Sequence, residues 1–214
     1  MMKVQPIFPP RPKSKITPAN LPVYESSGKW CVQRKFNGQR TIIHVSEDRT
    51  ISIFGRECEE HGNFIPTQNL ITQLQQLDYQ PGKSYWLDGE LLHAKTTTPE
   101  YKNKIILFDV LQEGNYFFQR TTLLERYDVL KRICRNPLTL EPKNGIALFV
   151  TPNVWMAETF FDNFSQHFHE KKHLDEIEGL VVKKRDSVLD STGHRYYEST
   201  WLIRCRKPTK NYNH

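Results

Sequence analysis

A lysine that follows a strand-like run, with glycine and arginine close behind it, is the first part of this sequence that could carry chemistry. Residues 35–40 read KFNGQR, so Lys35 is followed by Gly38 and Arg40. Glycine permits a tight turn that brings the backbone close to a ligand. Arginine binds phosphate or hydroxyl groups through a planar set of donors. Such a spacing is common by chance, so it indicates a nucleotide site only together with further residues.

Those further residues lie on later strand-like segments. Asp88 and Glu90 share an aromatic strand, FDVL closes another at 108–111, and EGLVVKK opens a third at 178–184. A fourth segment, 201–207, places Arg204 and Arg206 on one face, because side chains alternate along a strand. Carboxylates and cations spread over several strands could converge on one triphosphate and its metal ion.

Two widespread phosphate-binding motifs are missing. Gly82-Lys83-Ser84 resembles the end of a P-loop, but Leu77 stands where its first glycine is required. The chain also contains no G-x-G-x-x-G, so a dinucleotide-binding fold has no support. A nucleotide site in this chain therefore depends on the strand-borne residues.

The elements that must position these residues are mainly strands. Hydrophobic patterning predicts strands at 30–34, 41–45, 51–54, 84–92, 104–110, 145–150, 179–184 and 201–206, and helices at 66–77, 121–134 and 157–171. Because strands and helices do not alternate regularly, we predict an α+β fold of antiparallel sheets flanked by helices. Residues 1–22 hold six prolines and no periodicity, so we expect a basic extended arm before a single domain at 23–214.

The charge distribution favours a polyanionic partner. The 214 residues carry a net charge of +6. Residues 1–40 contribute +7 and residues 183–214 contribute +5, so the middle of the chain carries −6. Basic patches bind nucleic acid through counterion release, although excess charge can also serve solubility alone. With four scattered cysteines and neither a signal peptide nor a membrane-length apolar run, we expect a cytoplasmic protein with reduced thiols and no membrane partner.

In their order, these segments resemble the covalent nucleotidyltransferases: ATP-dependent DNA ligases, RNA ligases and mRNA-capping guanylyltransferases. The resemblance runs from Gln33 to Lys207 and implies a nucleotidyltransferase (adenylation) domain that uses ATP and Mg²⁺. It implies that Lys35 is the nucleophile of the motif K-x-[D/H/N]-G-x-R. DNA ligases of the family usually carry aspartate where this chain has Asn37, and RNA-ligase relatives vary there.

The resemblance also implies roles for other residues. Glu178 would bind the metal ion, Glu90 would bind the ribose, and Phe108 would stack on the base. The nucleotide-binding set implied by the family comprises Gln33, Arg40, Arg56, Glu90, Phe108, Lys183, Arg204 and Arg206. The last family motif, K-x-K, fits either Arg204 and Arg206 or a second register through Cys205 and Lys207. Only one register of a regular strand can face the nucleotide.

By this resemblance, we predict an ATP-dependent polynucleotide ligase that forms lysyl-AMP and seals nicks between a 5′-phosphate and a 3′-hydroxyl. The segment QRTTLLER at 119–126 resembles the L-x-E-R stretch of DNA ligases, so nicked duplex DNA is favoured over RNA. Only seven residues follow Lys207, so we expect no appended oligonucleotide-binding barrel. Basic flanks or a partner chain would then supply further duplex contacts.

Three alternatives stay open. The chain could be an RNA ligase, a GTP-dependent capping guanylyltransferase, or a non-catalytic nucleic-acid-binding module. The presence of Lys35, Glu90 and Glu178 argues against the last, because a binding module needs no nucleophile.

Overall fold

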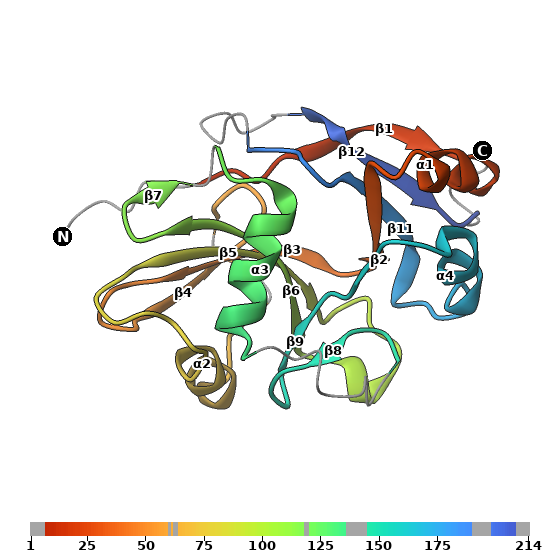
Figure 1. Cartoon of the computed structure of the whole chain (residues 1–214). Coiled ribbons are helices and arrows are strands. Elements are labelled where there is room, and N and C mark those ends of the chain that lie inside the picture. The colour runs from red at the N-terminus through yellow and green to blue at the C-terminus, as the bar shows by residue number, and fades with distance from the viewer. Residues whose placement is uncertain are drawn as a thin grey trace.

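Two β-sheets lie side by side with helices on their outer surfaces in the computed structural model (Figure 1). The structure describes residues 7–59, 61, 64–117, 120–135, 145–189 and 198–208. Strand-like patterning dominates the sequence, and the structure confirms the predicted α+β class. Besides these two sheets, the described ranges form no separate barrel.

The first sheet has five strands in the order β1-β12-β11-β2-β10. All neighbours are antiparallel except β1 and β12, which run parallel. The strands are β1 (Arg11–Ile16), β2 (Trp30–Phe36), β10 (Thr159–Phe160), β11 (Ile177–Lys184) and β12 (Glu198–Arg206). Because successive side chains of a strand point to opposite sides, this sheet has two different faces. Val32, Val182 and Cys205 are buried on one of these faces. The other face carries the polar residues of the predicted site.

The second sheet follows the order β4-β3-β5-β6-β9-β8, with β7 paired to β6. Among the described strands of this sheet, β6 and β9 form the one parallel pair. The strands are β3 (Gln39–Val45), β4 (Ile51–Phe54), β5 (Tyr85–Leu92), β6 (Lys104–Glu113), β7 (Tyr116–Phe117), β8 (Leu148–Phe149) and β9 (Val154–Met156). Both sheets are thus mixed rather than purely antiparallel, because β1 and β9 join their sheets as parallel neighbours.

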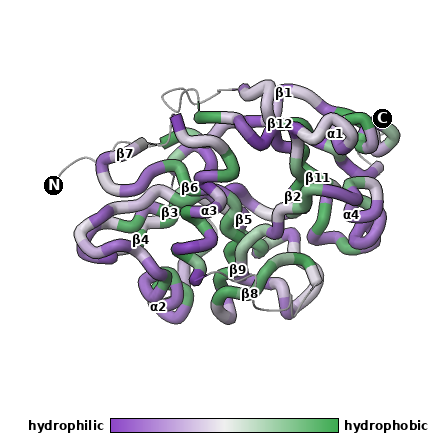
Figure 2. The backbone as a smooth tube through the Cα atoms, in the orientation of Figure 1, coloured by the Kyte–Doolittle hydropathy of each residue, from purple (hydrophilic) through white to green (hydrophobic). Residues whose placement is uncertain are grey.

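Helices cover the apolar faces. They are α1 (Leu21–Ser26), α2 (Gln68–Gln75), α3 (Leu123–Ile133) and α4 (Phe164–Glu170), with short 3-10 helices at Pro18–Asn20 and Pro99–Tyr101. Leu70 and Leu74 of α2 and Leu130 of α3 pack on the second sheet in the main core. Figure 2 shows hydrophilic residues concentrated on α2 and α4. These short helices thus present polar residues outward while their apolar positions are buried.

The start of α3 is specified locally. The side chain of Thr122 accepts a hydrogen bond from the Glu125 N–H, and the Glu125 carboxylate accepts one from the Thr122 N–H at 2.7 Å. This capping box satisfies two N–H groups that the first helical turn leaves unpaired. The sequence therefore identified this helix, predicted at 121–134, nearly to its ends.

Two predictions about elements are wrong. The expected extended arm is a strand at Arg11–Ile16 within the first sheet; residues 1–6 of the arm lie outside the described residues. Pro12, the one proline within this strand, is tolerated because β1 is an edge strand, where a missing N–H donor costs little. The helix predicted at 157–171 begins only at Phe164, because Thr159–Phe160 pairs with β2 instead.

Candidate nucleotide-binding site

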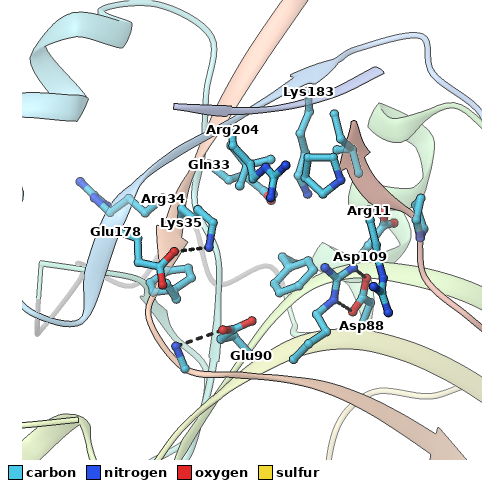
Figure 3. A pocket seen from close by; sticks show the side chains of 18 of the residues that line it. Arg11, Gln33, Arg34, Lys35, Asp88, Glu90, Asp109, Glu178, Lys183 and Arg204 are labelled. Carbon is cyan, nitrogen blue, oxygen red and sulfur yellow. Dashed lines mark hydrogen bonds and ion pairs between the residues drawn. The ribbon is translucent and has the colours of Figure 1, made fainter. Parts of the chain in front are cut away.

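A cavity of about 430 Å³ lies between the two sheets, and polar side chains from both converge on it (Figure 3). Its volume is within the range of small-molecule sites. All ten residues singled out from the sequence line this cavity: Gln33, Lys35, Arg40, Arg56, Glu90, Phe108, Glu178, Lys183, Arg204 and Arg206. The fold therefore brings together residues that are up to 173 positions apart.

Lys35 is in direct contact with a carboxylate at one end of the cavity. Its Nζ contacts the side chain of Glu178, and the Nε of Arg206 lies 3.3 Å from the same carboxylate. The strand register explains this meeting, because Gly179 is paired with Lys35 on β2 and with Arg206 on β12. Gly179 has a φ of 136° and approaches the Cys205 carbonyl so closely that a Cβ atom would lie 2.1 Å from it. Only glycine permits this approach of the strands beside Lys35.

The turn after Lys35 is fixed by a second carboxylate. The Gly38 N–H donates to Glu90 Oε1 at 3.0 Å. A Cβ atom on Gly38 would lie 2.4 Å from the Leu91 carbonyl oxygen, so this position also requires glycine. Burial raises the pKa of Glu90, while the nearby positive charges of Lys35 and Arg40 act in the opposite direction. Glu90 thus has a structural partner in Gly38 and also faces the cavity.

The opposite end of the cavity holds a buried ion pair and an aromatic ring. The Arg40 guanidinium makes a two-pronged contact with Asp88. Burial opposes the charge on Arg40, but Asp88 outweighs that effect and raises the Arg40 pKa. The Arg40 guanidinium carbon lies 4.8 Å from the centre of the Phe108 ring, and Lys183 Nζ lies 5.1 Å from it. Burial lowers the pKa of Lys183.

The structure separates the two registers of the last motif. Arg204 and Arg206 line the cavity, whereas Cys205 is fully buried on the opposite face of β12. Lys207 points elsewhere and donates to the carbonyl oxygens of Lys172 and Leu174 at 3.0 and 2.6 Å. The register through Arg204 and Arg206 therefore faces the cavity.

A donor of Arg204, which lines the cavity, indicates that the cavity binds an anion. The Nε of Arg204 is buried and has no hydrogen-bond partner among the residues that the structure describes. Buried donors are rarely left unsatisfied in native proteins, so an orphaned one calls for an acceptor. A phosphate oxygen is the acceptor that an arginine binds best.

Sequence reasoning missed several residues of the cavity. Arg11 reaches it from β1 and pairs with Glu57 at 3.3 Å, and Lys95 reaches it from the loop after β5. Asp109 faces the cavity while its carboxylate accepts two hydrogen bonds from Arg126 of α3. No motif signals Arg11 or Lys95, since their place depends on how distant segments pack.

The carboxylates of the cavity suit a magnesium ion bound together with a substrate. Among the described residues, no group of three or more aspartate, glutamate, histidine or cysteine side chains could hold a metal ion. Mg²⁺ usually binds through one or two carboxylates and the phosphates of a nucleotide. Glu178, which lines the cavity beside Lys35, fits that type of shared site.

Comparison with solved structures identifies the fold. Mycobacterial DNA ligase D in complex with ATP has 16% sequence identity and a TM-score of 0.63 over 93% of this chain. The ligase domain of M. tuberculosis LigD has 14% identity and a TM-score of 0.61 over 92%. The chain has the fold of a DNA ligase domain.

That fold extends to smaller enzymes. A Lig E DNA ligase, described as binding DNA with a minimal scaffold, has 14% identity, a TM-score of 0.52 and matches 96% of this chain and 70% of its own. The chain spans about three fifths of the two mycobacterial structures, 60% and 58%. No protein-family model and no curated protein sequence matches the chain. None of the helices in the described ranges has the length and apolarity to cross a membrane.

Proposed function

We propose that this chain is an ATP-dependent polynucleotide ligase that forms lysyl-AMP at Lys35 and seals nicks in duplex DNA. The observation that carries the proposal is the convergence of the ten predicted residues on one cavity, with Lys35 in contact with Glu178. The DNA ligase fold supports the same reading.

In the first step, the Lys35 amine attacks the α-phosphorus of ATP. A nitrogen–phosphorus bond forms, the bond from that phosphorus to the bridging oxygen breaks, and pyrophosphate leaves with the electron pair. Glu178, which is in contact with the Lys35 amine, orients it, and the proton lost from Lys35 passes to water. Arg204 and Arg206 hold the oxygens of the α-phosphate, where negative charge develops.

In the later steps, a 5′-phosphate oxygen of the nick attacks the same phosphorus and releases Lys35. The 3′-hydroxyl then attacks the 5′-phosphate, joins the strands and expels AMP. When bound, Mg²⁺ would neutralise phosphate charge, with Glu178 as its protein ligand. Phe108 would stack on the base, and Gln33, Arg40, Arg56, Glu90 and Lys183 would complete the nucleotide site.

Duplex contacts are proposed for the first sheet. Lys13 and Lys15 of β1 are exposed, and Lys15 is paired with Arg204 in the parallel register. Paired residues of neighbouring strands point to the same face, so the positive face of β12 continues onto β1. This strand would contact the phosphate backbone, and a partner chain would add surface if sealing requires more.

The test is transfer of radiolabel from [α-³²P]ATP to the protein. The wild type should form a labelled adduct that survives denaturing gel electrophoresis. Lys35→Ala has no amine to attack with, and Lys35→Arg carries a guanidinium that stays protonated, so both variants should form none. Circular dichroism checks that both variants fold. An undiminished adduct in either variant refutes the assignment of Lys35.

Parallel reactions separate the alternatives. An adduct with GTP only would indicate a capping guanylyltransferase, and no adduct with either nucleotide would indicate a binding module. Nicked DNA and nicked RNA substrates then distinguish a DNA ligase from an RNA ligase.

A further inference from the structure

The loop between β5 and the 3-10 helix at Pro99–Tyr101 is anchored by a buried carboxylate. Glu176 is 1% exposed and accepts hydrogen bonds from the Thr98 N–H at 2.9 Å, the Thr97 N–H at 3.2 Å and the Thr97 hydroxyl at 3.3 Å. These hydrogen bonds to a charged acceptor lower the pKa of Glu176 against the opposing effect of burial. The ionised carboxylate therefore fixes the loop firmly.

The same glutamate is tied to the reactive end of the cavity. Its backbone carbonyl accepts a hydrogen bond from the Asn37 N–H at 2.8 Å, and the Asn37 side chain donates to the Asp175 carbonyl at 3.0 Å. Asn37 lies two residues after Lys35, and Glu176 lies two residues before Glu178. The loop is thus held against both segments that supply the Lys35–Glu178 contact.

This loop carries Lys95, an exposed residue that lines the cavity. None of the described residues forms an ion pair with Lys95. Several other cations of the cavity have carboxylate partners: Arg40 contacts Asp88, and Arg206 contacts Glu178. Lys183 and Arg204 also line the cavity without a carboxylate contact among the described residues, but both are on strands of the first sheet, whereas Lys95 is on a loop. Lys95 is therefore an exposed ammonium group of the cavity lining that forms no ion pair with the described residues, on a loop that Glu176 anchors through Thr97 and Thr98.

We propose that Lys95 binds the β- and γ-phosphates of ATP, and hence the departing pyrophosphate, and that Glu176 positions it. The inference rests on the proposed function. When the bond from the α-phosphorus to the bridging oxygen breaks, the electron pair moves onto pyrophosphate. An ammonium group beside this leaving group stabilises the added negative charge. Lys95 is a binding residue for the distal phosphates, and Glu176 is a positioning residue that does not touch the nucleotide.

The test is calorimetric binding of two nucleotides. The first is α,β-methylene-ATP, which cannot release pyrophosphate, and the second is AMP, which lacks the distal phosphates. Lys95→Met should weaken α,β-methylene-ATP binding by about 10- to 100-fold, the effect of one charged hydrogen bond. AMP binding should change less than about twofold. Lys102→Met is the matched control, because Lys102 is exposed near the same loop but does not line the cavity.

Glu176 is tested in the same assay. Glu176→Ala should weaken α,β-methylene-ATP binding as Lys95→Met does, and the double variant should be no weaker than Lys95→Met alone. Glu176→Gln retains an acceptor oxygen and should lose less. Thermal unfolding checks that each variant folds. If Glu176→Ala does not fold, Glu176→Gln takes its place in the binding comparison.

The opposing results are distinct. If Lys95→Met weakens both ligands equally, or neither, Lys95 does not bind the distal phosphates. If Glu176→Ala weakens binding further in the Lys95→Met background, Glu176 acts on Lys35 or Glu178 rather than through Lys95. A wild type that binds α,β-methylene-ATP but forms no adduct with ATP contradicts the proposed function, while the comparison of the two ligands still decides the role of Lys95.

Discussion

Arg126 is the residue whose loss should reveal most about how α3 supports the site. Its side chain is fully buried and donates to both Asp109 carboxylate oxygens, at 2.8 and 3.0 Å. It also donates to the carbonyl oxygens of Thr121 at 2.8 Å and Ser187 at 3.3 Å. Arg126 therefore joins the helix, the strand β6 and the segment after β11 at one point.

The variant Arg126→Met keeps most of the side-chain volume but leaves Asp109 charged, buried and without its partner. Removing one partner of a buried ion pair lowers the free energy of unfolding by about 3–5 kcal/mol. For a chain of this length each kcal/mol lowers the melting temperature by about 2–4 °C, so we expect a decrease of about 6–20 °C. Asp109→Asn combined with Arg126→Met should be more stable than the sum of the single variants by about 1–3 kcal/mol, because no charge is left unpaired.

Urea unfolding followed by tryptophan fluorescence measures these free energies. Arg132→Met is the matched control, because Arg132 lies on the same helix and pairs with Glu113 while its side chain is 35% exposed. Losing this more exposed pair should cost about 1 kcal/mol or less. If Arg126→Met costs no more than Arg132→Met, the buried pair does not stabilise the packing of α3 as argued.

Three further predictions follow from particular contacts. The added Cβ of Gly38→Ala would clash with the Leu91 carbonyl oxygen and displace the turn that follows Lys35. Adduct formation should therefore slow by about 10²-fold in a radiolabel time course. An unchanged rate would show that this turn does not position Lys35. Replacing both Lys13 and Lys15 by alanine should flatten the salt dependence of nick sealing by up to about 1.8 in log–log slope, with adduct formation unchanged; an unaltered sealing curve would exclude β1 as a phosphate contact. Burial and the neighbouring Glu59 raise the pKa of Cys58 to about 11, so little of this thiol is thiolate at neutral pH. The rate of its alkylation by iodoacetamide, followed by mass spectrometry, should therefore rise about tenfold per pH unit from pH 7 to 10. Rapid alkylation that is independent of pH would contradict that environment.

The sequence alone determined the strands that carry the predicted site. Alternating and β-branched runs predicted β2, β3, β4, β5, β6, β11 and β12 close to their observed bounds. These features are local, because strand propensity and side-chain alternation act over neighbouring residues. The resemblance of the motifs likewise selected ten residues, from Gln33 to Arg206, that the fold gathers in one cavity. Their roles stay predictions until the adduct and binding experiments are done.

Only the tertiary structure decided where the irregular segments lie. The strand β1 forms because Arg11–Ile16 pairs with β12, nearly the whole chain away, and no local pattern encodes such a partner. The same holds for Thr159–Phe160, which pairs with β2 although its neighbours read as a helix. Lys95 lines the cavity from a loop that Glu176, 81 residues later in the chain, anchors through the Thr97 and Thr98 N–H groups. Pairing and anchoring of this kind depend on long-range contacts, which a strand or helix pattern cannot specify.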